Sequence, residues 1–178
     1  MKLSTRDLCA LGVMTAFIAV AAQISIPLPY GVPFTMQTFA IPLAGVVLGS
    51  KRGTLCALAY LLLGVVGLPI FSGFTSGFGV LFGPTGGFIL SFPLMSLLAG
   101  MDTSRENRTP RLWLGIVAGF IINFICGAAL FALVTESSWQ VALTSCVVPF
   151  LPTSVAKVLL VGVIGKRCYS LLNKATFR

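Results

Sequence analysis

The chain has 178 residues, of which 57% are hydrophobic and only 9% are charged, and its mean hydropathy is +1.01. Soluble domains carry about 25% charged residues, so this composition excludes a soluble domain and predicts an integral membrane protein. Twelve basic and four acidic residues give a net charge of +8. No basic face with interleaved aromatic residues lies outside the apolar runs, so we expect no nucleic-acid partner and relate the charge to membrane topology.

Six apolar runs predict an all-α protein with six transmembrane helices. A β-barrel would instead show short strands in which apolar and polar residues alternate. Because no linker or repeat separates the runs, we expect residues 1–178 to form a single transmembrane domain. The predicted helices cover residues 8–26, 36–49, 53–68, 84–101, 112–134 and 141–165.

The first apolar run has two interpretations. Lys2 and Arg6 precede it, and Ala19-Val20-Ala21 has the small-x-small pattern of a cleavage site, as in a secretory signal peptide. However, the run continues past that site to Ile26, which favours a helix that is retained in the protein.

The basic residues predict the orientation of the helices. Eleven of the twelve fall on one side of the predicted spans, and the opposite side has none. Because cytoplasmic loops are enriched in Lys and Arg, we expect a multi-pass protein of the cell membrane with both termini in the cytoplasm. Loops 27–35, 69–83 and 135–140 would then face outward. The eleven residues are Lys2, Arg6, Lys51, Arg52, Arg105, Arg108, Arg111, Lys166, Arg167, Lys174 and Arg178.

The second outer loop opens the segment PIFSGFTSGFGVLFGPTGGFILSFP, residues 69–93, which has six glycines between Phe71 and Gly87. Glycine lets the backbone approach a ligand closely, and the interleaved phenylalanines offer flat apolar faces. We therefore expect the loop to contact a ligand. The alternative is a flexible hairpin whose phenylalanines dip into lipid. The phenylalanines concerned are Phe71, Phe74, Phe78 and Phe82.

Lys157 is the one basic residue inside a predicted span. It lies nine residues before Lys166, or ~13 Å along a helix, near the middle of a hydrocarbon core of ~30 Å. Burial of lysine there costs on the order of 2.5–3.5 kcal/mol, so the side chain should face a polar cavity. All four acidic residues are assigned to loops or helix ends, so we expect the ligand to supply an anionic or carbonyl partner, with Ser154 and Asn123 as neutral helpers. The alternative is a lysine that snorkels towards an interface.

Two prolines, Pro149 and Pro152, precede this lysine. A proline within a helix removes a hydrogen bond and frees a carbonyl group, which membrane helices tolerate where protein or a cavity satisfies it. We expect the segment PFLPTSVAK to be bent or locally unwound, either as the wall of a binding site or as a plain structural kink.

Several chemistries have no residues to support them. The chain has no histidine, and Gly165-Lys166-Arg167 lacks the glycine spacing and the Ser or Thr of a phosphate-binding loop. The spacing of the five cysteines matches no metal or redox motif. We therefore expect no enzyme activity, no ATPase site, no cofactor and no metal.

Three motifs, PFTMQT at 33–38, GLPIF at 67–71 and GPTGG at 83–87, resemble the BioY family of biotin-uptake proteins. These are the substrate-binding (S) components of energy-coupling-factor (ECF) transporters. The resemblance is close over residues 24–100 and looser in the sixth predicted helix. It implies a six-helix protein that captures biotin from outside with high affinity. It also implies that the protein functions in a complex with a transmembrane coupling protein and two cytoplasmic ATPases.

The resemblance also implies a set of functional residues. Gly12 and Ala16, one turn apart on the first predicted helix, would dock the coupling protein. In the family pattern an acidic residue lies three positions before the lysine and the pair contacts the ureido ring, whereas this chain has Ser154 there. The residues expected near biotin are Phe34, Thr35, Gln37, Tyr60, Phe74, Gly83, Thr85, Gly86, Asn123, Ser154 and Lys157.

Two other functions remain open at this stage. The chain could be a stand-alone facilitator or secondary transporter of biotin or another small organic anion, which would work without an ATPase partner. A membrane enzyme or a purely structural subunit is less well supported, because no acid-base or nucleophilic set of residues is visible.

Overall fold

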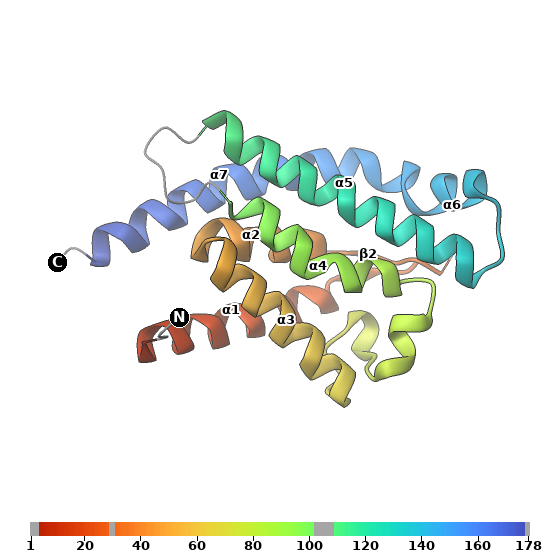
Figure 1. The fold of residues 1–178 in the computed structure, drawn as a ribbon, viewed down its shortest axis with the longest axis horizontal. Coiled ribbons are helices and arrows are strands. Elements are labelled where there is room, and N and C mark those ends of the chain that lie inside the picture. The colour runs from red at the N-terminus through yellow and green to blue at the C-terminus, as the bar shows by residue number, and fades with distance from the viewer. Residues whose placement is uncertain (1–3, 29–30, 102–108, 177–178) are drawn as a thin grey trace.

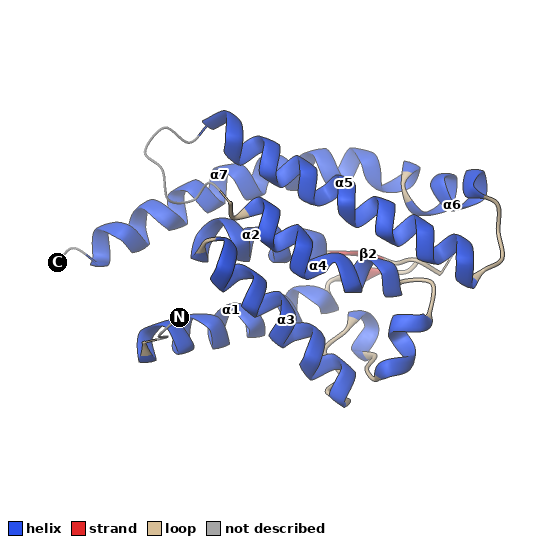
Figure 2. Cartoon of the chain, in the orientation of Figure 1, coloured by secondary structure: helices blue, strands red, loops and turns tan. Residues whose placement is uncertain are grey.

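The protein is mostly helical, with one pair of very short strands (Figure 2). This is a computed structural model that describes residues 4–28, 31–101 and 109–176. Lys2, Arg105, Arg108 and Arg178 lie outside the described residues, as does the side chain of Lys174. The helices are α1 (Thr5–Gln23), α2 (Gln37–Leu48), α3 (Ser50–Val66), α4 (Gly86–Ala99), α5 (Thr109–Val134), α6 (Trp139–Cys146) and α7 (Leu151–Thr176). Three 3₁₀ turns, η1 (Ser72–Phe74), η2 (Phe78–Phe82) and η3 (Val148–Phe150), and the antiparallel strands β1 (Ser25–Ile26) and β2 (Phe34–Thr35) complete the fold.

The short helix α2 lies at the centre of the molecule. Nine of its twelve residues are buried, and it packs against α1, α3, α4, α5 and α7. After Gln37 and Thr38 the helix is apolar on every side, as expected of a helix with no solvent-facing surface. Pro42 does not end it, since the helix continues to Leu48. The core is therefore built around α2.

Glycine residues allow α2, α3 and α4 to pack closely. A Cβ atom at Gly53 of α3 would overlap the backbone of Gly45 in α2, and a Cβ at Gly45 would overlap the carbonyl group of Ser96 in α4. Small residues at such crossings let helix backbones approach where the surroundings are apolar. The three helices are therefore in close backbone contact with one another.

Helix α1 packs mainly against α3 through an inner face that includes Thr15 and Ile18. Its first turn has a capping box between Ser4 and Asp7, and Asp7 forms an ion pair of 2.9 Å with Arg52 of α3. The opposite face of α1, which includes Gly12 and Ala16, is exposed.

The sixth predicted helix is two helices, so its expected bounds of 141–165 are wrong. Helix α6 ends at Cys146, the turn η3 follows, and α7 runs on to Thr176. Pro149 lies in η3, where its lack of an N–H group prevents continuation of the α-helical hydrogen bonds. Pro152 lies in the first turn of α7, where an N–H group has no helical partner and proline is well tolerated. The expected bend at PFLPTSVAK is confirmed.

Three described helical segments are long and apolar enough to cross a membrane. They are Thr5–Gln23, Pro110–Val134 and Trp139–Tyr169, whereas α2 and α4 are shorter apolar helices of 12 and 14 residues. At 1.5 Å per residue these two extend only ~18 and ~21 Å, less than the ~30 Å of a hydrocarbon core. The other predicted helices agree with the structure to within three residues at each end.

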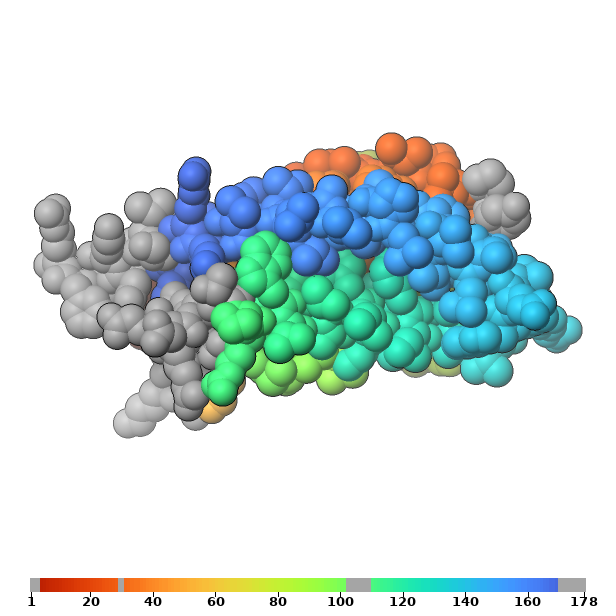
Figure 3. Space-filling view, turned by 90° about the horizontal axis from the view of Figure 1, so that it is seen from above, coloured from red at the N-terminus to blue at the C-terminus, as the bar shows by residue number. Residues whose placement is uncertain are grey.

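The connections divide between two ends of the molecule. Figure 1 shows the start of α1, the α2–α3 turn, the start of α5 and the end of α7 at the left. The strands, η1, η2 and the α5–α6 connection lie nearer the right. In the view from above, α5 and α7 lie side by side across one face (Figure 3).

Candidate functional site

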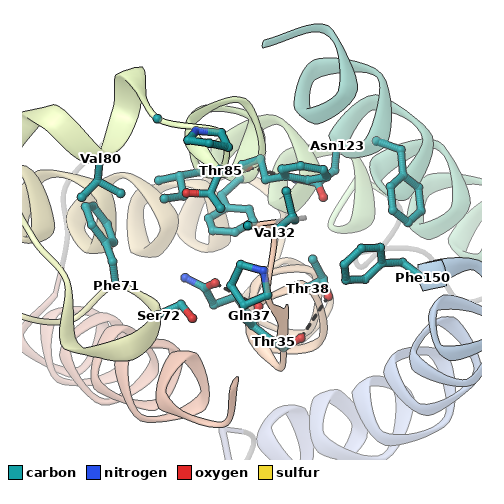
Figure 4. Close-up of a pocket in the computed structure, with 18 of the residues that line it drawn as sticks. Val32, Thr35, Gln37, Thr38, Phe71, Ser72, Val80, Thr85, Asn123 and Phe150 are labelled. Atoms are coloured by element: carbon teal, nitrogen blue, oxygen red, sulfur yellow. Dashed lines mark hydrogen bonds between the residues drawn. The ribbon is translucent and has the colours of Figure 1, made fainter. Parts of the chain in front are cut away.

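A cavity of about 370 Å³ lies among the segment 31–38, the segment 71–85, and parts of α4, α5 and α7 (Figure 4). Cavities that hold small molecules measure roughly 300–1,000 Å³. Its walls are mostly apolar in area, but eight neutral polar side chains and one charged side chain, Lys157, also line it. This combination suits a compact ligand that has both an apolar body and hydrogen-bonding groups.

The ammonium group of Lys157 is buried and already has protein partners. Its Nζ donates to the Thr35 carbonyl at 2.7 Å and to Thr38 Oγ1 at 2.8 Å, and it lies 4.0 Å from the centre of the Phe34 ring. The side chain is only 5% exposed. An ammonium group has three N–H donors, so these two bonds leave one for a ligand.

The structure corrects the expected partners of this lysine. The expected polar cavity is present, but neither Ser154 nor Asn123 is the hydrogen-bond partner of Nζ. Its partners come from the corner between β2 and α2, where Thr38 Oγ1 also donates to the Thr35 carbonyl at 3.4 Å. The charge is therefore partly compensated before any ligand binds.

Gln37, at the start of α2, links the cavity to buried groups behind it. Its Oε1 accepts from Thr35 Oγ1 at 2.9 Å, and its Nε2 donates to Tyr60 Oη at 2.6 Å. Tyr60 Oη in turn donates to the Ile70 carbonyl at 3.0 Å. Gln37 lines the cavity, whereas Tyr60 is fully buried behind it.

Asn123 of α5 faces the cavity from the other side. Its Nδ2 donates to the Phe88 carbonyl at 3.0 Å and to Ser91 Oγ at 2.8 Å, both on α4. These bonds use the two donors of the amide group, so Oδ1 is the group that remains to interact with a ligand.

Aromatic rings form much of the cavity wall. Phe150 of η3 lines the cavity and stacks on Phe34 with ring centres 6.4 Å apart. Phe71 also lines the cavity and is fully buried against Tyr60, with ring centres 5.5 Å apart. By contrast Phe78 and Phe82 of η2 are 61% and 64% exposed, so only part of the aromatic loop faces inward.

The structure brings seven of the eleven predicted binding residues to the cavity and leaves four outside it. Phe34 packs against Lys157, and Tyr60 lies behind Gln37. Phe74 is 70% exposed and does not line the cavity, while Gly86 packs against the Leu81 carbonyl. The seven are Thr35, Gln37, Gly83, Thr85, Asn123, Ser154 and Lys157.

Some cavity residues were missed by the sequence reasoning. Thr38 follows Thr35 by three residues, a spacing that allows a side chain at the start of a helix to reach back to the preceding strand. Phe88 and Phe92 are four residues apart on α4, so they share one helix face, and both line the cavity. The spacing of four residues between Phe88 and Phe92 was the sequence signal that could have identified them as neighbours in the cavity wall. Among the described residues, no group of three or more His, Cys, Asp or Glu side chains could hold a metal ion.

The fold and the cavity define a helical membrane protein with an internal cavity of small-molecule size and a single charged side chain in its wall. A family model described as the BioY family matches residues 1–174. The chain therefore belongs to the BioY family.

Individual relatives and a solved structure agree with this family. "Biotin transporter BioY2" of Lactococcus lactis is 38% identical over 166 residues, which cover 92% of this chain and 89% of the relative. "Biotin transporter BioY" of Thermotoga maritima is 43% identical over 122 residues, covering 68% and 72%. The crystal structure of "the S-component for biotin from an ECF-type ABC transporter" has a TM-score of 0.82 and 30% identity, and the match covers 91% of this chain and 89% of that one.

Proposed function

We propose that this protein binds biotin from outside the cell and serves as the S component of an ECF-type importer. The observation that carries the proposal is the cavity, in which Lys157 keeps one free N–H donor among neutral hydrogen-bonding groups and aromatic rings. The similarity to proteins named as biotin transporters supports the choice of ligand.

The chemistry of biotin complements this cavity. Its ureido ring has a carbonyl acceptor and two N–H donors, its sulfur-containing ring is apolar, and its side chain ends in a carboxylate. The third N–H group of Lys157 can donate to an oxygen of biotin, and Asn123 Oδ1 can accept from an N–H group. The rings of Phe71, Phe88 and Phe150 offer apolar contact to the sulfur-containing ring.

Ser154 contributes to this site as a neutral group. It is buried, lies three residues before Lys157 on α7 and lines the cavity. A serine hydroxyl can donate or accept a hydrogen bond but cannot neutralise an ammonium group. In this protein, Thr35 and Thr38 therefore share the compensation of the lysine charge that the family pattern assigns to an acidic residue.

The proposal includes six membrane spans with both termini in the cytoplasm. The five predominantly apolar helices α1, α2, α4, α5 and α7, together with α3, would cross the membrane. Arg6, Lys51, Arg52 and Arg111 lie near the end of the bundle where α1 and α5 begin, which supports the cytoplasmic assignment of that end. The cavity lies nearer the other end, which would face the outside.

Partner proteins would supply the energy for uptake. The sequence has no phosphate-binding loop, so ATP hydrolysis would fall to two cytoplasmic ATPases, connected through a transmembrane coupling protein. The exposed face of α1 supports a docking role, because a Cβ added at Gly12 would meet no described atom within 4 Å outside its own stretch of the helix.

Titration of the purified full-length protein with biotin tests the proposal. We expect saturable one-to-one binding by calorimetry. Uptake of labelled biotin into vesicles, with and without an ECF coupling protein and its ATPases, then distinguishes an importer subunit from a stand-alone facilitator. Lack of saturable binding would contradict the proposed ligand, and equal uptake without partners would favour the facilitator.

A further inference from the structure

A chain of hydrogen bonds runs from the cavity wall to a backbone carbonyl in the outer loop. It starts at Thr35 Oγ1, passes through the Gln37 amide and Tyr60 Oη, and ends at the Ile70 carbonyl, with distances of 2.9, 2.6 and 3.0 Å. Its members come from β2, α2, α3 and the segment before η1. Thr35 and Gln37 line the cavity, whereas Tyr60 does not.

The end of the chain fixes the direction of every bond in it. A carbonyl oxygen can only accept, so Tyr60 must donate its single hydroxyl hydrogen to Ile70. Tyr60 Oη can then only accept from Gln37, which requires the NH₂ side of the amide to face Tyr60. Gln37 Oε1 consequently faces Thr35, and the Thr35 hydroxyl donates its hydrogen to it. The orientation of the amide thus follows from the bonding pattern.

These bond directions determine how the Thr35 hydroxyl can interact with a ligand in the cavity. Its hydroxyl has one hydrogen, which is committed to Gln37, so towards a ligand it can act only as an acceptor. Thr38 Oγ1 is similar, because it donates to the Thr35 carbonyl and accepts from Lys157. This corner of the cavity therefore offers acceptor atoms next to the donor of Lys157.

We propose that Tyr60 is a positioning residue for ligand selection, which acts through Gln37 to hold Thr35 as an acceptor for an N–H group of the ligand. The inference rests on the proposed function, since biotin is the ligand that supplies the N–H group. A site built to pair with a buried N–H group discriminates strongly against an analogue with an oxygen at the same place, because two acceptor atoms then face each other.

Tyr60→Phe removes the hydroxyl group and leaves the ring. The ring packs edge-on against Phe71, and its centre lies 6.5 Å from the ring centre of Phe92, so the variant should keep the packing of α3 against the loop and α4. Without Tyr60 Oη, the Gln37 amide loses the acceptor that fixes its orientation. Rotation of the amide then frees Thr35 to donate as well as accept.

The experiment measures the affinities of biotin and of its two cyclic-carbamate analogues, each with an oxygen in place of one ureido N–H group. We expect the parent protein to bind at least one analogue about a hundredfold or more weakly than biotin. In Tyr60→Phe, biotin affinity should fall about tenfold, while the ratio of biotin to analogue affinity should fall to about ten or less. A role limited to packing would weaken all ligands alike and leave the ratio unchanged.

Gln23→Leu is a matched control. Gln23 Nε2 also donates to the Ile70 carbonyl, at 3.2 Å, but Gln23 is not part of the link to Thr35 and does not line the cavity. This variant should keep the parent ratio. Gln37→Leu removes the acceptor of the Thr35 hydrogen and should lower the ratio as Tyr60→Phe does.

The outcomes separate the two proposals. If the parent protein does not bind biotin, the proposed function fails. If it binds biotin and the ratio is unchanged in Tyr60→Phe, the proposed function stands and the positioning role of Tyr60 is wrong. A ratio that falls equally in Gln23→Leu would also overturn that role, because the effect would then come from the loop.

Discussion

Lys157 shows how this fold keeps a positive charge inside a bundle of apolar helices. A carbonyl oxygen, a hydroxyl oxygen and an aromatic ring surround its ammonium group, and all three belong to the segment 34–38. Hydrogen bonds to charged groups contribute roughly 1.5–3 kcal/mol each, of the same order as the insertion cost of a buried lysine. Lys157 therefore also holds the corner between β2 and α2 against α7.

Lys157→Met should weaken biotin binding by about ten- to hundredfold, because one oxygen of biotin loses a charge-assisted hydrogen bond. From the insertion cost of a buried lysine alone, loss of the charge would be expected to preserve or improve folding. With Thr35 and Thr38 as partners of Nζ, we now expect the ligand-free variant to melt at a lower temperature than the parent. Calorimetric titration and thermal melting in detergent measure the two effects.

Threonine variants provide the matched comparison. Thr38→Val removes one partner of Lys157 at nearly constant volume and should weaken biotin binding less than Lys157→Met does. Thr54→Val removes a hydroxyl group that donates to the Ser50 carbonyl within α3 and does not line the cavity. This variant should change neither the biotin affinity nor the melting temperature. Parent-like biotin affinity in Lys157→Met would identify Lys157 as a structural residue.

At the scale of single residues, the sequence predicted which polar residues belong to the site better than it predicted which side chains of a loop face the cavity. Lys157 and Asn123 were predictable because a polar side chain within an apolar run needs a partner, whereas Gln37 was expected only from the motif PFTMQT. Phe74 was assigned to the site from its place in the aromatic loop, yet its backbone has a φ of +57° and its ring is exposed. Which phenylalanine of a loop turns inward depends on backbone angles that residue spacing does not reveal. The same applies to Thr38, whose role depends on the position of α7.

Among the elements, the turn before α4 depends on glycine for packing rather than for contact with a ligand. A Cβ at Gly86 would overlap the Leu81 carbonyl, whereas a Cβ at Gly83 would lie 3.4 Å from the Val80 carbonyl, an ordinary contact. Gly86→Ala should therefore destabilise the protein by about 1–3 kcal/mol through overpacking, and Gly83→Ala should not. Thermal melting of the two variants in detergent tests this difference. Equal melting temperatures would show that the loop can move away from α4.

The helices themselves were largely predictable, because long apolar runs leave few alternatives. The break between α6 and α7 was predictable from Pro149, but the length of α7 was not. Its last part mixes basic, polar and apolar residues and continues the helix beyond the apolar run to Thr176, so the apolar boundary at 165 did not mark the helix end. The central place of α2 was also not predictable, because the sequences of α4 and α5 are as apolar as that of α2.

For the whole molecule, the basic residues near one end of the bundle predict the orientation in the membrane. A reporter fused after Arg178, or inserted near Asn107, should report the cytoplasm. A reporter inserted between Thr75 and Ser76, in the loop next to the cavity, should report the exterior. If the sites at 107 and 75 report the same side, the arrangement of six spans is wrong.

The exposed face of α1 offers the sharpest test of assembly at this scale. Because Gly12 is exposed and a Cβ added there would meet no described atom within 4 Å outside its own stretch of α1, Gly12→Trp should leave the bundle and its cavity intact. The bulky ring would, however, keep a partner helix from close approach, so the complex with an ECF coupling protein should be lost. Leu114→Trp, at a position of α5 that is 67% exposed, is the matched control and should assemble normally. Co-purification measures assembly, and calorimetry measures biotin binding. Loss of biotin binding with normal assembly in Gly12→Trp would reverse the assignment, because α1 would then support the cavity rather than the partner.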